Sequence, residues 1–421
     1  MSAISSPVNS AKSAFHLARK YMNSIDRKIL FLQGHPSGFW HRLATGLETG
    51  GVPTRKVNFC LADWAFWHRR GAINYRGRFR NWPTWLEIFI QNEKITDILY
   101  YADRHPYHAA AADVARKLGV NCWAIEFGYL RPDWLTMEAD GMGPKSRFPK
   151  QKNQIETLAR KAGKADMVLR YPHSFLEEAV GEVLFNLLLV FGRPFYPFFF
   201  SDKYYWPVID YLAWLPELAR SRKQAFIAKQ VSQKCLDDQF QYNLVAMQLQ
   251  SDYQIRSSTK YNHLEEFLRE ILTSFAKHAP AERHLVFKIH PLDNGLENWP
   301  RRIASLTSEF GLKHRVHVIK GGPLDKLISN SKGVVLANST VGLHAIRLGV
   351  PIITLGDAVF DIPDLSHQAG LDKFWNEAEP VSPTFASDFF RALTTTQIKG
   401  SFYNRTGQNA AIKQIVGKFS S

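Results

Sequence analysis

The feature that most constrains the fold of this chain is a pattern that occurs twice, in which short apolar runs alternate with helix-like amphipathic segments. In the first half we expect strands over residues 28–32, 55–59, 97–101 and 121–125, and helices over 37–48 and 109–118. In the second half we expect strands over 242–247, 285–289, 315–319, 333–336 and 351–354, and helices over 264–275, 324–330 and 341–348. Such alternation is typical of parallel sheets. The chain is therefore predicted to be an α/β protein with two Rossmann-like domains that face an interdomain cleft.

The length of 421 residues fits two to three domains. We expect a polar N-terminal tail over 1–27, which lacks the apolar stretch of a secretory signal. A first Rossmann-like domain is expected over 28–180, an aromatic and helical bridge over 181–240, a second Rossmann-like domain over 241–375, and a helical segment over 376–421.

The composition of the chain limits the classes of partner that we expect. Lys and Arg number 53 against 38 Asp and Glu, which gives a net charge of +15 and favours an anionic partner such as nucleic acid, anionic lipid or a nucleotide-activated acidic sugar. A hydrophobic content of 45% argues against intrinsic disorder. Three widely spaced cysteines exclude a disulfide framework and a CxxC metal site, so a reducing cytoplasm is the expected compartment.

The segment 184–200 is strongly apolar, but it is shorter than a membrane span and is interrupted by Asn186, Arg193, Pro194 and Pro197. We therefore reject a transmembrane helix. The aromatic run continues to Trp206 with basic residues nearby. Two interpretations stay open, an aromatic core between domains and contact with a membrane–water interface.

Ligands of open α/β sheets bind at the carboxyl ends of the strands, and this rule selects the polar residues to consider. In the first half, Gln33 and Gly34 follow the strand 28–32, and Glu126 ends the strand 121–125. Glu126 could exchange a proton with a sugar hydroxyl, and Arg131 could neutralise an acidic substrate. The alternatives are a plain turn at Gln33–Gly34 and a structural ion pair between Glu126 and Arg131.

In the second half, Gln248, Gln250 and Asp252 follow the strand 242–247. An orientable carboxylate among neutral amides suits a nucleophile, whereas the alternative is an aspartate that caps a helix.

Two more strand ends in this half carry candidate phosphate ligands. Lys288 and His290 end the strand 285–289, and the hydroxyl pair Ser339–Thr340 precedes a predicted helix, where an anion could bind. Simple N-capping by Ser339 and Thr340 is the alternative. No P-loop, GxGxxG, HExxH or GxSxG motif is present, which argues against the enzyme classes that those motifs define.

Five segments, in their order along the chain, carry a resemblance to a known family. They are FLQGHPSGFWHRLATGLETGGVPTRKVNFCLADWAFW, IEFGYLRPDWLTMEADGMG, LVAMQLQSDYQIRSST, FKIHP and ANSTVGLHAIRLGVPIITLG. In this order and spacing they resemble the capsule polysaccharide biosynthesis proteins of KpsS/LipB type, which are related to the KpsC modules. The resemblance covers residues 28–375.

The resemblance implies a GT-B-like, retaining β-Kdo transferase that uses CMP-Kdo and builds a Kdo linker on a (lyso)phosphatidylglycerol-type lipid, with no metal and no other cofactor. It implies a cytoplasmic enzyme, peripheral at the inner face of the inner membrane, with the capsule export machinery as a further partner. The first domain would hold the acceptor and the second the CMP-sugar.

The resemblance also implies roles for individual residues. Asp252 falls in the nucleophile-bearing segment, and Glu126 with Gly128 matches the acid–glycine motif of the acid/base. The implied donor-binding residues are Lys288, His290, Pro291, Ser339, Thr340 and Gly342. The implied substrate-binding residues are Gln33, Gly34, Arg131, Gln248 and Gln250.

The sequence departs from the family pattern at two places. Ala62–Asp63 stands where we expect Gly-Asp, and His344 stands where many GT-B enzymes carry Glu. Two other functions stay open. One is a non-catalytic protein that binds the glycolipid for an ABC transporter. The other is a nucleic-acid binder, for which the net charge is the sole motive; we expect no nucleic-acid partner.

Overall fold

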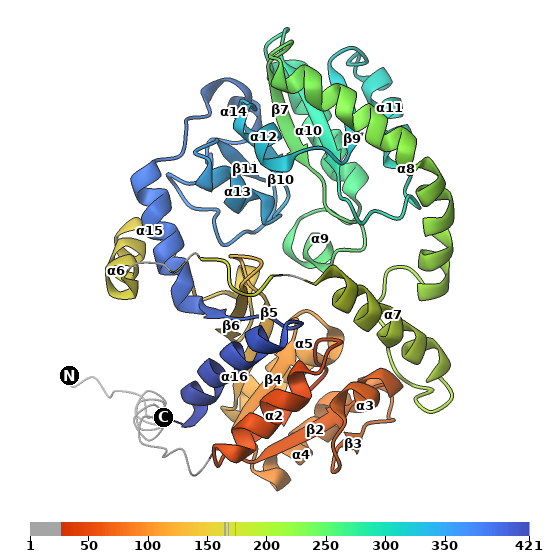
Figure 1. Cartoon of the computed structure of the whole chain (residues 1–421), viewed down its shortest axis with the longest axis vertical. Helices are drawn as coiled ribbons and strands as arrows, with labels where there is room; N and C mark the ends of the chain where they lie inside the picture. The colour runs from red at the N-terminus through yellow and green to blue at the C-terminus, as the bar shows by residue number, and fades with distance from the viewer. Residues whose placement is uncertain (1–26, 164–165, 167, 173, 421) are drawn as a thin grey trace, which may run out of the picture. The chain divides into compact units, whose positions relative to one another are not determined.

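The computed structural model describes residues 27–163, 166, 168–172 and 174–420, so the expected tail over 1–27 lies, except for Arg27, outside the described residues (Figure 1). The chain forms two compact units. The first unit comprises residues up to 141, 169–200 and 398–421, and the second comprises 142–168 and 201–397. Each unit is described by itself.

The first unit is built on a seven-stranded sheet in the order β12-β6-β5-β4-β1-β2-β3. Five neighbouring strands are parallel, and β6 runs antiparallel to β5. The strands are β1 (Ile29–Phe31), β2 (Thr54–Asn58), β3 (Ile73–Asn74), β4 (Asp97–Tyr101), β5 (Asn121–Phe127), β6 (Trp134–Ala139) and β12 (Gln397–Lys399). The order reverses between β1 and β4, which makes their carboxyl ends the expected ligand position.

Helices of the first unit cover this sheet. They are α2 (Phe39–Thr49), α3 (Leu61–Trp67), α4 (Trp82–Glu93), α5 (Pro106–Leu118), α7 (Phe175–Phe191) and α16 (Arg405–Ser420), with a 3₁₀ turn η3 (Phe79–Asn81). The sequence marks the ends of α5, because Pro106 lies in its first turn and Gly119 closes it with φ of 70°. The C-terminal α16 lies against α2, and its Ala411, Ile415 and Phe419 belong to the same core as β1 and β4 (Figure 1).

The second unit has a five-stranded sheet in the order β11-β10-β7-β8-β9, and every neighbouring pair is parallel. The strands are β7 (Tyr242–Ala246), β8 (His284–Ile289), β9 (Val316–Lys320), β10 (Val334–Leu336) and β11 (Ile352–Thr354). In chain order this is the 3-2-1-4-5 arrangement of a Rossmann-like sheet, with its reversal between β7 and β10.

The helices of the second unit are α6 (Lys152–Ala162), α8 (Pro207–Leu236), α9 (Tyr253–Ser258), α10 (Leu264–His278), α11 (Trp299–Glu309), α12 (Leu324–Ser329), α13 (Val341–Arg347), α14 (Leu371–Glu377) and α15 (Pro383–Leu393); short 3₁₀ turns are η4 (Gly143–Lys145) and η5 (Thr394–Thr396). In α10 the buried apolar residues recur every three or four positions, from Leu264 through Leu268 and Ile271 to Phe275, so that one face packs on the sheet.

The prediction of an α/β protein with two Rossmann-like sheets is confirmed, and all nine expected strands are present. The interdomain cleft stays a prediction. The unit boundaries differ from the expected domain boundaries in four segments. Residues 142–168 and 376–397 belong to the second unit, 398–421 returns to the first, and the expected bridge 181–240 divides at residue 200. The physical reason is packing, since α6 lies on α15 and α16 lies on α2.

Among the described residues, no helix combines the length and the apolar character that crossing a membrane requires.

Candidate functional site

At the switch point of the second unit, a reciprocal pair of hydrogen bonds joins the ends of β7 and β10. The Gln248 side-chain amide donates to Asn338 Oδ1 at 2.9 Å, and the backbone N–H of Asn338 donates to Gln248 Oε1 at 3.1 Å. The Asn338 amide also donates to the carbonyls of Gln254 and Ser258. Asn338 therefore ties α9 to the switch point. The sequence did not single out this residue, although it directly precedes the Ser339–Thr340 pair.

Asp252 lies beside this pair, half-buried, as the N-cap of α9. Its Oδ1 accepts the backbone N–H of Gln254 at 2.9 Å, and its Oδ2 accepts from the Gln248 amide at 3.2 Å. The helix-capping alternative is therefore correct as a description of its contacts. The cap also fixes the orientation of the carboxylate, which is compatible with a second role as a nucleophile. That role stays a prediction.

Gln250 is buried and its polar atoms serve the backbone. Its Oε1 accepts the N–H of Leu264, the first residue of α10, at 2.8 Å, and its amide donates to the carbonyl of Asn262 at 3.4 Å. These contacts explain Gln250 as a structural residue that fixes the start of α10, and its contact with substrate stays a prediction.

The end of β8 carries two of the expected phosphate ligands. Lys288 is only 8% exposed, and burial lowers its pKa. His290 accepts the backbone N–H of Leu292 on Nδ1 at 3.1 Å, so in the neutral ring the proton lies on Nε2, which is then the donor. Pro291 is exposed. Lys288 and His290 therefore place two hydrogen-bond donors at the end of one strand, and contact of Lys288, His290 and Pro291 with a nucleotide phosphate stays a prediction.

The contacts of the segment after β10 agree in part with the helix-capping alternative. Ser339 Oγ accepts the N–H of Val341 at 3.3 Å, whereas Thr340, the N-cap residue of α13, makes no side-chain cap. A Cβ on Gly342 would lie 2.5 Å from the Phe360 ring, so packing explains this glycine. His344 pairs with Asp325 at 3.2 Å on the surface. Nucleotide contacts by Ser339, Thr340 and Gly342 stay predictions.

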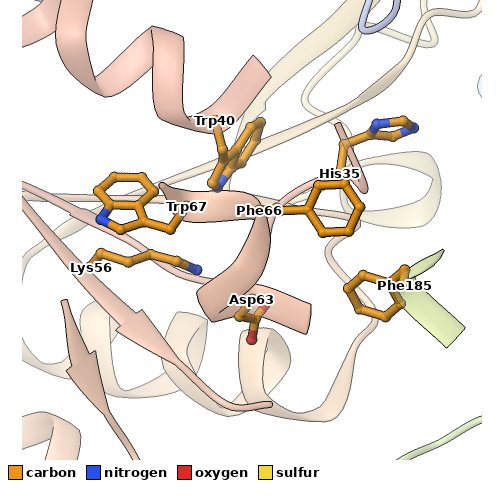
Figure 2. Close-up of a pocket in the computed structure, with 8 residues that line it drawn as sticks. His35, Trp40, Lys56, Asp63, Phe66, Trp67 and Phe185 are labelled. Carbon is orange, nitrogen blue, oxygen red and sulfur yellow. The ribbon is translucent and has the colours of Figure 1, made fainter. Parts of the chain in front are cut away.

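In the first unit, the turn after β1 is filled by protein side chains (Figure 2). A Cβ on Gly34 would lie 2.5 Å from Trp40, and the Gln33 amide donates to Asp63 Oδ2 at 3.3 Å. The buried Lys56 ammonium donates to the carbonyl of Leu32 at 2.8 Å. Burial lowers the pKa of Lys56, and the nearby Asp63 opposes this shift. The remaining cavity has a volume of about 10 Å³, which is room for a single water.

His35, in the same turn, is enclosed by aromatic rings. It stacks on Phe402 at 4.3 Å between centroids and contacts Tyr101 and Phe127 edge-on, and its Nε2 is 2.9 Å from the Tyr403 hydroxyl. Burial lowers the pKa of His35 to about 3. The ring is therefore neutral at physiological pH and has a structural role.

Glu126 lies half-buried near the end of β5, paired in register with Thr136 of β6. The pKa of the neighbouring Tyr101 is raised by burial and then by the charges of Glu126 and Glu182, while Arg131 acts in the opposite direction. The Arg131 guanidinium lies over the Phe127 ring at 4.9 Å. Arg131 and the expected acid/base therefore both act on Tyr101, and the role of Arg131 in substrate binding stays a prediction.

Two further carboxylates belong to this cluster, and sequence reasoning missed them. The pKa of Tyr403 is raised by burial and then by Glu178 and Glu182 of α7, and Arg131 again opposes the shift. Helix α7 is held on the turn after β1, where a Cβ on Gly181 would lie 2.4 Å from the Pro36 carbonyl oxygen. No sequence signal links α7 or Tyr403 to Glu126, because they are distant along the chain.

Within the described part of the chain, no group of three or more His, Cys, Asp and Glu side chains is arranged to hold a metal ion.

Comparisons with known proteins identify the family. The sequence profile described as "Capsule polysaccharide biosynthesis protein" matches residues 96–403. The chain is 30% identical over 395 residues to the capsule polysaccharide modification protein LipB of Neisseria meningitidis serogroup B, covering 90% of this chain and 92% of LipB. It is 27% identical over 383 residues to the capsule polysaccharide export protein KpsS of Escherichia coli, covering 90% of this chain and 97% of KpsS.

Among solved structures, the KpsC β-Kdo 2,7-transferase of Thermosulfurimonas dismutans aligns with a TM-score of 0.44 and 14% identity, over 92% of this chain and 99% of KpsC. The profile match extends over most of the chain, and it confirms the resemblance that the sequence motifs indicated. The chain belongs to the capsule polysaccharide biosynthesis protein family.

Proposed function

We propose that this protein is a retaining glycosyltransferase that moves β-Kdo from CMP-Kdo to a (lyso)phosphatidylglycerol-type lipid in capsular polysaccharide linker synthesis. The observation that carries the proposal is the fixed carboxylate of Asp252 at the β7/β10 switch point, held by Gln248 and by the first turn of α9. The capsule polysaccharide biosynthesis family, to which the chain belongs, supports the choice of reaction.

In the first step, an Asp252 carboxylate oxygen attacks the anomeric carbon of Kdo. The bond between that carbon and the phosphate oxygen breaks, and CMP leaves with the electron pair. Lys288 and the Nε2–H of His290 stabilise the developing negative charge on the phosphate, as preorganised donors do in other transfer reactions. The hydroxyls of Ser339 and Thr340 supply further donors.

In the second step, Glu126 takes the proton of the acceptor hydroxyl. The acceptor oxygen attacks the anomeric carbon, and the bond to Asp252 breaks, which restores the carboxylate and retains the configuration. Glu126 belongs to the first unit and Asp252 to the second. The mechanism therefore includes the claim that both side chains act on one donor.

The test is incubation of the purified chain with CMP-Kdo and lysophosphatidylglycerol. We expect release of CMP and a lipid heavier by one Kdo. Asp252→Ala should lower the rate by about 10³-fold or more, because removing a catalytic nucleophile costs several orders of magnitude in kcat. Asp325→Ala, at an exposed aspartate paired with His344, is the matched control and should retain activity. Full turnover by Asp252→Ala would end the proposal.

We also propose that α7 contacts the membrane that carries the acceptor. Five apolar residues of α7 recur every three or four positions and are 43% to 73% exposed, namely Leu176, Val180, Leu184, Leu187 and Phe191. They form one apolar stripe, which we call the α7 stripe. In contrast, Leu189, Tyr196 and Phe199 are buried, and Phe199 stacks on Tyr107 within the first unit.

Two arginines contact the aromatic segment that follows α7. Arg76 lies over the Tyr196 ring at 5.5 Å, and Arg78 lies over the Phe198 ring at 4.9 Å. An exposed apolar helix face with aromatic residues and arginines beside it suits the interface of an anionic bilayer.

Sedimentation with vesicles tests this contact. The chain should bind phosphatidylglycerol vesicles, and Leu184→Glu should weaken binding roughly tenfold, because it places a charge in the apolar contact. Leu348→Glu changes a comparably exposed leucine of the second unit and should leave binding unchanged. Equal effects of both variants would exclude the α7 stripe as the contact.

A second candidate function is a non-catalytic role in export, which the name of the Escherichia coli relative favours. It predicts glycolipid binding with no release of CMP from CMP-Kdo, so the assay described above separates the two functions.

A further inference from the structure

The second unit contains a cavity that the proposed transfer mechanism does not use. Its volume is about 380 Å³, within the range of small-molecule sites. One face of α8, the end of β9 and the loop that follows β8 form its walls. The apolar part of the lining comes from Ile227, Ile289, Pro300, Val318 and Ile319.

The α8 side of the cavity is one continuous helix face. Glu217, Arg220, Gln224 and Ile227 follow each other at intervals of three or four residues, so their side chains lie on the same side of the helix. The opposite wall comes close at Gly295, where φ is +79° and a Cβ would lie 2.7 Å from Glu217 Oε2. The glycine therefore permits the loop to approach the helix and close that side of the cavity.

The acidic groups of the lining are already satisfied. The Lys320 ammonium donates to Glu217 Oε1 at 2.5 Å and to the Asp293 carbonyl at 2.6 Å, and Gln224 donates to Glu217 at 2.7 Å. Burial raises the pKa of Glu217, but the bonds from Lys320 and Gln224 lower it on balance. Burial raises the pKa of Asp293, whose Oδ1 accepts the backbone N–H of Gly295 at 3.0 Å.

The remaining charge at the opening is positive. Arg220 is 61% exposed and its Nη1 is 3.8 Å from Glu217 Oε2, which is too long for a hydrogen bond, and Lys223 is also exposed. A ligand that enters the cavity therefore passes two cations and then meets aliphatic side chains. This combination selects a molecule with an anionic group at one end and an apolar body at the other.

The cavity is distinct from the expected donor site on the same sheet. Ile289 lines it, whereas Lys288, the preceding residue of β8, does not. Successive side chains of a strand point to opposite faces, so the expected phosphate ligand Lys288 is directed away from this cavity.

We propose that this cavity, which we call the α8 cavity, is a binding site for a small amphipathic anion, such as an alkyl phosphate, whose charge pairs with Arg220 and Lys223 and whose apolar body lies against Ile227, Ile289 and Val318. The proposal does not rest on the transferase reaction, since no residue that lines the α8 cavity has a role in the proposed mechanism.

A thiol-protection experiment tests the α8 cavity in the full chain. Cys60, Cys122 and Cys235 are buried, so a thiol installed by Ile227→Cys is the reactive one towards an aromatic disulfide reagent. We expect octyl phosphate to slow its labelling in a saturable manner, and octanol or inorganic phosphate at the same concentration to protect much less. Protection by octanol as strong as by octyl phosphate would overturn the proposed charge recognition.

Charge variants in the Ile227→Cys background complete the test. Lys223→Glu should raise the half-protecting concentration of octyl phosphate about tenfold or more, because it replaces attraction by repulsion. Arg222→Glu is the matched control, since Arg222 is exposed on the same helix but does not line the cavity, and it should cause no change. The proposal would be overturned if both variants had an equal effect, or if octyl phosphate gave no protection. Protection by CMP would also overturn it, because it would assign the cavity to the donor site.

Discussion

At the scale of single residues, His35 shows how a buried ring couples stability to pH. Its neutral ring is enclosed by Phe402, Tyr101 and Phe127 and bonded to Tyr403. Burial lowers the pKa of His35 from 6.5 to about 3, so between these values the unfolded chain binds a proton that the folded chain does not. Stability is therefore lost as the pH falls below about 6.5.

The first prediction follows from this difference. Between pH 7 and pH 5, His35 should remove about 2 kcal/mol from the free energy of unfolding. The variant His35→Gln has no group that binds this proton, so its free energy of unfolding should fall correspondingly less over the same pH interval. The variant should be less stable than the unchanged chain at pH 7, because the packing of the ring is lost. Urea titrations of both proteins at the two pH values measure the difference. If both proteins lost the same stability between pH 7 and pH 5, His35 would not be the proton-binding group.

Glu182 carries a second prediction at this scale, which depends on the transferase proposal. Glu126 and Glu182 both act on Tyr101, so removing the Glu182 charge should favour the ionised form of the proposed base. In Glu182→Gln, the acid limb of the pH–rate profile for Kdo transfer should move to lower pH. Glu177→Gln, on the exposed side of α7, is the control and should keep the profile of the unchanged chain. If Glu182 had a merely structural role, its replacement would lower the rate of Kdo transfer without moving the acid limb of the pH–rate profile.

At the scale of elements, the contact of α7 with the turn after β1 depends on a glycine. A Cβ on Gly181 would lie 2.4 Å from the Pro36 carbonyl oxygen, and a backbone atom cannot move aside cheaply. Alanine is the better helix former by about 1 kcal/mol, but overpacking of this kind costs about 1–3 kcal/mol. The cost of the clash should exceed the gain in helix propensity, so Gly181→Ala is expected to destabilise the first unit.

Gly417 in α16 provides the matched comparison. A Cβ there would meet no atom within 4 Å, so Gly417→Ala should stabilise by up to about 1 kcal/mol through helix propensity alone. Thermal unfolding of the two variants should shift in opposite directions. A gain in stability for Gly181→Ala would show that α7 is not held closely on the turn.

The same elements show what the sequence could predict and why. Strands buried in a parallel sheet are apolar on both faces, so β1, β4, β7 and β8 stand out as apolar runs. β6 contains Thr136 and Glu138 and continues the sheet antiparallel after a turn, and β12 has one apolar residue, Ile398, between Gln397 and Lys399, so neither gives such a run.

The residues of the candidate site likewise fall into those that the sequence could predict and those that it could not. Gln248, Asp252 and Lys288 follow or end single strands, so their placement needs local information alone. The contribution of Glu178, Glu182 and Tyr403 depends on how α7 and the C-terminal segment return to the first sheet. Such long-range packing leaves no periodic trace in the chain.

At the scale of the whole molecule, the first unit is assembled from three separate stretches of chain, and the last of them is part of its core. Phe402, Ala411, Ile415 and Phe419 are fully or almost fully buried against β1, β4 and α2. The second unit has its own continuous core between α10, α11 and the strands β7 to β11. Loss of the C-terminal stretch should therefore affect the two units unequally.

The chain ended after Gln397 tests this expectation. Hydrogen exchange should show the amides of 28–141 and 169–200 losing protection, because the apolar area that α16 covers becomes exposed, while those of 242–354 keep it. Ile415→Asp should produce a milder form of the same pattern, since it places a charge in the buried side of α16. Lys413→Asp changes an exposed residue of the same helix and should leave both patterns intact. Loss of protection in both units together would mean that they unfold as one cooperative body, and the assignment of the C-terminal stretch to the first unit's stability alone would be wrong.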